Sequence, residues 1–141
     1  MGRILDAGRL AGSGSNRQPW RFLLVESESA REQLAAAVYE STNVRGAQLI
    51  AAIIGRSGFD TGRCAQNMLL AAWDAGVGSC PNGLQDPDAA RAALGLGADE
   101  ELAIVLTFGY PAHERAPERR TAEEWSTRAA RKPLDKLIDR I

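Results

Sequence analysis

The sequence predicts one soluble domain of mixed α and β structure, and three observations lead to this prediction. The chain has 141 residues, a length that suits one domain with one hydrophobic core. Three continuous apolar runs have the length of buried strands, and they alternate with segments whose apolar residues recur at helical spacing. No internal repeat or low-complexity tract interrupts this order.

The expected elements follow one another along the chain. A short helix over 4–11 ends at the run from Gly12 to Ser15, whose residues are poor at continuing a helix. Buried strands are expected at 20–25, 49–54 and 102–108. Further helices are expected from near 29 to 38, over 60–75 and over 86–94, and the apolar stripe of a last helix contains Leu134, Leu137, Ile138 and Ile141.

The helix expected over 60–75 carries apolar side chains on nearly all sides, so a large fraction of its surface should be buried. A second subunit would provide the cover that so small a chain lacks, and this favours a dimer. The stretch from Gly76 to Gly83 contains glycines and a proline that end the helix. It is expected to form a loop that leads to the helix at 86–94.

Composition excludes several classes of partner. Seventeen basic and eighteen acidic residues leave a net charge of -1, which gives no electrostatic reason to expect binding to nucleic acid. No apolar run approaches the roughly 18 residues that a membrane-spanning helix needs. The first residues also lack the apolar centre of a secretory signal, so the cytoplasm is the expected compartment.

The sequence shows no combination of side chains that would catalyse a reaction without a cofactor. The single histidine, His113, lies in a charged segment far in sequence from any serine in a nucleophile-like context. Cys64 and Cys80 are distant from each other and from the histidine, which makes a metal site improbable and predicts buried free thiols. Neither a phosphate-binding P-loop nor a Rossmann glycine motif is present.

The segment from Ser13 to Phe22 is the strongest indication of a small-molecule site. Gly14 allows unusual backbone conformations, and Pro19 fixes the exit of the loop into an apolar strand. Hydrogen-bonding side chains fill the loop: Ser13, Ser15, Asn16 and Gln18. Together with the later segments 60–67 and Phe108-Gly109-Tyr110-Pro111, this loop resembles the nitroreductase family of flavin-dependent oxidoreductases.

The resemblance covers nearly the whole chain and implies an α+β fold. The expected architecture is nitroreductase-like, with an antiparallel-rich central sheet flanked by helices in an intertwined homodimer. Residues 1–141 would form one such domain, without the N-terminal basic segment that family members usually carry. The resemblance also implies one FMN cofactor at each of two sites across the subunit interface.

The resemblance assigns the cofactor-binding residues as well. Ser13, Ser15, Asn16 and Gln18 match the loop that contacts the flavin, although they also suit ordinary turns and caps. Asn82 and Gly83 match a stretch whose backbone amides approach the reactive N5 edge of the flavin, and a simple connecting loop is the alternative there. Arg131 and Lys132 match a basic pair that binds the flavin phosphate, although basic pairs are common on any surface.

The function implied by the resemblance is oxidoreduction in which the flavin carries the chemistry, so no catalytic side chain is expected. Hydride would pass from NADH or NADPH through flavin N5 to an electron-poor acceptor such as a nitroaromatic or a quinone. The choice between the two nicotinamides and the identity of the acceptor stay open. A non-catalytic dimeric module of the same fold, with or without flavin, is the alternative.

Overall fold

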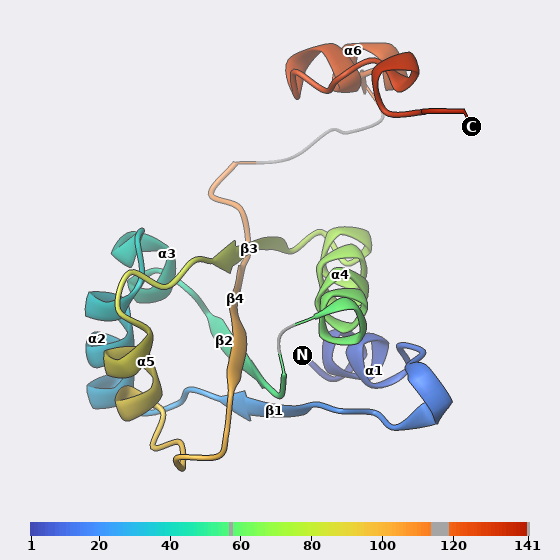
Figure 1. The fold of residues 1–141 in the computed structure, drawn as a ribbon. Helices are drawn as coiled ribbons and strands as arrows, with labels where there is room; N and C mark the ends of the chain where they lie inside the picture. Colours follow the sequence, from blue (N-terminus) through green and yellow to red (C-terminus); the bar gives the residue numbers. More distant parts are fainter. Residues whose placement is uncertain (57, 114–118, 141) are drawn as a thin grey trace.

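The structure, a computed structural model, describes residues 1–56, 58–113 and 119–140. Its centre is a four-stranded antiparallel sheet with the order β1-β2-β4-β3 (Figure 1). The strands are β1 (Arg21–Leu24), β2 (Leu49–Ile54), β3 (Gly78–Asn82) and β4 (Leu102–Gly109). The three runs predicted as buried strands form β1, β2 and β4, so this part of the prediction is confirmed.

Strand β3 corrects the prediction of a loop between 76 and 83. Among the described residues it pairs only with β4, with Ser79 opposite Phe108 and Pro81 opposite Leu106. A proline lacks the backbone N–H that a central strand would use, and it is tolerated at the edge of a sheet. Long-range pairing therefore makes a strand from residues that carry no local strand signal.

The two faces of the central strand β2 belong to two hydrophobic clusters, because successive side chains of a strand point to opposite sides. Ile50, Ala52 and Ile54 pack in one cluster, and Ala51 and Ile53 pack in the other. The first cluster receives Leu34, Val44, Ala90 and Val105, and the second receives Ile4, Cys64, Met68 and Leu106. The sheet therefore separates two layers of helices.

One layer contains α1 (Gly2–Arg9) and α4 (Phe59–Asp74), and the other contains α2 (Glu28–Ala37), α3 (Ser41–Arg45) and α5 (Pro87–Ala93) (Figure 1). Helix α2 begins where the Ser27 hydroxyl accepts a hydrogen bond from the Ala30 nitrogen at 3.0 Å. Helix α5 begins in the same way at Asp86. The five-residue α3 is an element that the apolar spacing does not predict.

Only one side of α4 is buried within a single chain. Thr61, Cys64, Met68 and Ala72 face the sheet, whereas Leu70 is 57% exposed and Trp73 is 46% exposed. The expected burial of the remaining faces is therefore absent from one protomer. Within the described residues, no helix combines the length and the apolar character needed to cross a bilayer.

The last helix predicted around Leu134 is wrong. The C-terminal segment instead forms α6 (Ala122–Arg128) and a 3-10 turn, η3 (Leu134–Lys136), and Ile141 lies outside the described residues. Pro133 cannot donate the hydrogen bond of a helix that continues from α6, and Ala130 has a left-handed φ of 48°. Leu134 is exposed, so no packing surface within the described residues stabilises a longer helix there.

Glycine is required at the end of β2, where Gly55 has a φ of 149°. A Cβ atom at this position would lie 2.2 Å from the carbonyl oxygen of Pro19. Real side chains do not tolerate such a contact with backbone, so the close approach of the two segments depends on the absence of a side chain. Gly55 thereby fixes the entry of the chain into β1.

Candidate functional site

The loop from Ser13 to Gln18 has a strained backbone. It contains a 3-10 turn, η1 (Gly14–Asn16), and three of its non-glycine residues have left-handed φ values: 53° at Ser15, 53° at Asn16 and 49° at Gln18. Such values are uncommon outside glycine, and they persist where the surrounding structure holds them. The described part of the chain contains only one other left-handed non-glycine residue, Ala130.

Internal hydrogen bonds hold this loop in place. The Ser13 hydroxyl accepts from the Gln18 nitrogen at 2.8 Å, and the Asp60 carboxylate accepts from the Gly14 nitrogen at 3.0 Å. Ser13 therefore has the turn-stabilising role that the sequence left open. The side chains of Ser15 and Asn16 have no hydrogen-bond partner among the described residues, so their polar groups stay available to a ligand.

Asn82 directs its side chain into the protein and not toward solvent. The residue is 3% exposed, and its amide nitrogen donates to the Thr107 hydroxyl at 3.1 Å and to the Val105 carbonyl at 3.3 Å. Its Oδ1 atom is buried without a partner in the described structure. Any contact between Asn82 and a ligand therefore comes from the backbone, as the resemblance implies.

Gly83 lies against an exposed tyrosine. Its carbonyl oxygen accepts from the Tyr39 nitrogen at 3.1 Å, and a Cβ atom at position 83 would lie 3.0 Å from the Tyr39 ring. The carbonyl oxygen of Gly83 is used in this hydrogen bond, and the residue has no side chain. The groups exposed to solvent here are therefore backbone atoms and the ring of Tyr39.

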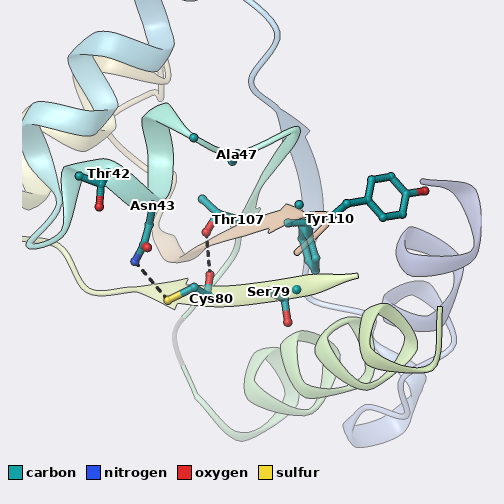
Figure 2. A pocket seen from close by; sticks show the side chains of 11 residues that line it. Thr42, Asn43, Ala47, Ser79, Cys80, Thr107 and Tyr110 are labelled. Atoms are coloured by element: carbon teal, nitrogen blue, oxygen red, sulfur yellow. Dashed lines mark hydrogen bonds between the residues drawn. The ribbon is translucent and has the colours of Figure 1, made fainter. Parts of the chain in front are cut away.

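A hollow of about 320 Å³ lies beside β3, between α3 and the end of β4 (Figure 2). Its polar lining includes the Cys80 thiol, which accepts from the Asn43 amide nitrogen at 3.3 Å, and the Thr107 hydroxyl, which donates to the Cys80 carbonyl at 3.2 Å. Tyr110 lies at the rim, where its backbone nitrogen donates to Gln48 Oε1. Backbone and polar side chains therefore line part of this hollow.

Sequence reasoning missed most of the residues around this hollow. Thr42 and Asn43 belong to the short helix α3, which carries no clear apolar period. Tyr110 could have been found, because it directly follows a buried strand in the motif that carries the family resemblance. No residue predicted to bind the cofactor lines the hollow. Asn82 is two positions after Cys80, which does line it.

The basic pair Arg131 and Lys132 lies between α6 and η3, and both residues are exposed. In Figure 1 the α6 ribbon lies above the sheet, on the side where β4 ends. Trp125 of α6 packs edge-to-face on Trp73 of α4, with ring centroids 6.4 Å apart. Among the described residues, no hydrogen bond or ion pair joins the basic pair to the loop at 13–18 or to Gly83.

The histidine and the two cysteines can be compared with what the sequence predicts for them. His113 is exposed, and no cluster of three or more potential metal ligands occurs among the described residues. Both cysteines are free, and burial raises the pKa of the Cys64 thiol to about 11. Cys80 is only partly buried, which differs from the prediction of two buried thiols.

Comparison with known proteins identifies the family. The model of the Nitroreductase family matches residues 1–57 and 52–110. The chain belongs to the nitroreductase family. The α+β prediction, with an antiparallel sheet between helices, is confirmed by this match and by the observed topology.

Three relatives illustrate the similarity. A protein of Archaeoglobus fulgidus with the provisional name NADH dehydrogenase/NAD(P)H nitroreductase is 28% identical over 146 residues, which cover 87% of this chain and 84% of that protein. A provisionally named nitroreductase from Desulfovibrio desulfuricans, crystallised in complex with FMN, is 30% identical with a TM-score of 0.72, covering 88% of this chain and 80% of that one. A nitroreductase family protein from Clostridium difficile 630 shares the fold, with a TM-score of 0.77, 24% identity, and coverage of 98% and 83% of the two chains.

Proposed function

We propose that two copies of this chain form an FMN-dependent oxidoreductase, which passes hydride from NADH or NADPH to an electron-poor acceptor such as a nitroaromatic or a quinone. The observation that carries the proposal is the loop at 13–18, whose strained backbone leaves the polar groups of Ser15 and Asn16 without a partner in the described structure. Membership in the nitroreductase family and the FMN complex of the Desulfovibrio relative support FMN as the ligand.

The residues present fit the parts of FMN. The exposed hydroxyl of Ser15 and the amide of Asn16 suit a ligand rich in hydroxyl groups. The backbone at Gly83 suits close approach of a planar ring, because glycine leaves room for it. Arg131 and Lys132 supply positive charge for a phosphate. FMN would supply a ring that accepts and donates hydride, which explains why the chain needs no paired catalytic side chains.

The site requires a second copy of the chain. Within the described residues of one protomer, no hydrogen bond or ion pair joins the loop, Gly83 and the basic pair, which belong to different elements of the chain. The outer face of α4 is also apolar, and its Leu70 side chain is exposed. Docking two copies through this face would bury apolar surface and bring groups of both chains to each site.

Each part of the chain then has a defined task. Ser15 and Asn16 orient the ligand by hydrogen bonds from a loop that Asp60 anchors to α4. The peptide at Asn82 and Gly83 places a fixed backbone dipole near the reactive edge of the ring, which needs no titratable group. Arg131 and Lys132 neutralise the phosphate. The apolar interface excludes water from the site.

The test is to purify the protein and measure its flavin content, its absorbance and its mass in solution. We expect a yellow dimer with FMN bound, whose absorbance near the visible flavin band is bleached by NADPH or NADH without oxygen and restored by a quinone. A colourless dimer that ignores added FMN would instead support the non-catalytic module. A flavin-loaded dimer that no nicotinamide reduces would limit the function to flavin binding.

A further inference from the structure

One arginine of α4 lies directly against Gly12, the residue that precedes the loop at 13–18. The guanidinium of Arg63 approaches the backbone of Gly12 so closely that a Cβ atom at position 12 would lie 2.8 Å from its Nη2 atom. Its Cζ atom also lies 5.5 Å from the centre of the Phe59 ring, within the range of a cation–π interaction. Glycine at position 12 therefore creates the space that the guanidinium occupies.

The hydrogen-bonding groups of Arg63 are otherwise unused. No carboxylate among the described residues lies within 4.0 Å of its guanidinium, and no described oxygen accepts a hydrogen bond from it. Many arginines of the main body do have carboxylate or carbonyl partners: Arg3, Arg9, Arg21, Arg31, Arg45 and Arg91. Arg63 is thus an exposed cation, held in place by an aromatic ring, with its donors directed to no described acceptor.

Arg63 lies on the turn of α4 that is hydrogen-bonded to the loop carrying Ser15 and Asn16. Asp60 lies one turn earlier on the same helix, and its carboxylate accepts from the Gly14 nitrogen at 3.0 Å. This hydrogen bond joins the loop to the turn of α4 that carries Arg63. A ligand held by the loop would lie near the turn of α4 that carries this guanidinium, and a forked guanidinium is best matched by a phosphate or a carboxylate.

We propose that Arg63 is a phosphate-binding residue of this site and that Gly12 is the position that admits its side chain. The inference rests on the proposed function, because it assigns a further ligand contact to the same loop. The ligand chemistry is a phosphate monoester, which occurs both in FMN and as the 2′-phosphate of NADPH. The experiment separates these two sources.

The direct test compares the dissociation constants of FMN and riboflavin for the purified dimer, measured by flavin fluorescence. Arg63→Gln should raise the dissociation constant of FMN about ten- to a hundredfold, because one or two charge-assisted hydrogen bonds are lost. It should leave riboflavin unchanged, since riboflavin has no phosphate. The control, Arg3→Gln, removes an equally charged and highly exposed arginine that pairs with Asp74, and it should change neither constant.

A second variant tests the role of Gly12 without removing charge. Gly12 does not have a left-handed φ, so Gly12→Ala is compatible with its backbone and forces only the guanidinium to move. Gly12→Ala should weaken FMN binding in the wild-type background. In the Arg63→Gln background its effect should be much smaller, as expected for two coupled residues. Circular dichroism and thermal melting of all variants check that the fold is retained.

The two sources of phosphate give different results. Loss of FMN affinity without loss of riboflavin affinity assigns Arg63 to the flavin phosphate, whereas a raised KM for NADPH with unchanged KM for NADH assigns it to the 2′-phosphate. If none of these constants changes while wild type binds FMN, the inference is wrong and the proposed function stands. If wild type binds neither flavin, the proposed function fails and this inference fails with it.

Discussion

The carboxylate of Asp60 accepts a hydrogen bond from the backbone nitrogen of Gly14 at 3.0 Å, and it joins the first turn of α4 to a loop 46 residues earlier in the chain. Both the loop and the helix are needed to make the candidate site, because the loop presents the polar groups and the helix presents Arg63 and the apolar face. This single contact therefore connects the ligand-binding part of the protein to its proposed dimer interface.

Asp60→Ala should loosen the loop. We expect the free energy of unfolding to fall by about 1 kcal/mol, the usual net value of one hydrogen bond, and the Gly14 amide to exchange with solvent faster. Hydrogen exchange followed by NMR measures the second effect directly. Asp74→Ala removes an exposed carboxylate at the other end of the same helix, whose 3.6 Å pair with Arg3 should contribute almost nothing. Equal exchange at Gly14 in both variants would contradict the anchoring role.

Asn16→Ala should weaken FMN binding or change the flavin spectrum, with thermal stability nearly unchanged, because the Asn16 side chain has no partner among the described residues. His113→Ala should change neither property. Ser13→Ala should instead lower stability by about 1 kcal/mol, because it removes the acceptor for the Gln18 nitrogen. If Asn16→Ala behaves like Ser13→Ala, the loop is an ordinary turn.

Replacing both Arg131 and Lys132 with alanine should greatly weaken FMN binding and leave riboflavin almost unaffected, since only contacts with the phosphate are removed. Both residues are exposed, so added salt should weaken the binding of FMN more than the binding of riboflavin in the wild-type protein. Dissociation constants measured across a salt series give both results. Equal losses of the two flavins would mean that the pair supports the C-terminal fold.

Leu70→Glu should dissociate the dimer, because it places a charge on the exposed apolar face of α4. Sedimentation velocity should show an obligate dimer for wild type and a monomer or unfolded chain for the variant. Ala36→Glu adds the same charge to an exposed position of α2 and should leave the dimer intact. A wild-type monomer that persists at low concentration with unchanged helicity would refute the dimer.

The two thiols should react at very different rates. Burial raises the pKa of Cys64 to about 11, so its thiol stays protonated at neutral pH and becomes reactive only as the pH approaches that value. Cys80 is partly exposed beside the hollow and should account for the rapid alkylation by iodoacetamide at pH 8. Mass spectrometry of Cys80→Ser should show loss of the fast-reacting thiol, and Cys64→Ser should retain it.

The fold was predictable where the signal lies within a short stretch of sequence. Strand β2 is a continuous apolar run buried on both faces, and its observed bounds equal those predicted. Strand β3 was not predictable, because Gly78 and Pro81 are poor strand formers that depend on pairing with β4. The helix expected at Leu134 failed for a related reason, since Leu134, Leu137 and Ile138 stay exposed among the described residues.

The candidate site shows the same division. Glycine, proline and polar residues around Asn16 predict a ligand-binding loop, but nothing local predicts that Ser15, Asn16 and Gln18 all adopt left-handed conformations. That backbone depends on contacts with distant residues such as Asp60. The hollow beside Cys80 likewise depends on α3 meeting the edge strand β3 and the end of β4.

The contact between Gly55 and Pro19 has a practical consequence for mutational screening. Every side chain at position 55 would collide with the Pro19 carbonyl, and the displacement would reach the loop that ends one residue earlier, at Gln18. Random libraries selected for activity should therefore reject almost all substitutions at Gly55. Such a pattern would imitate that of a ligand contact, although a glycine here acts only by keeping two backbone segments close together.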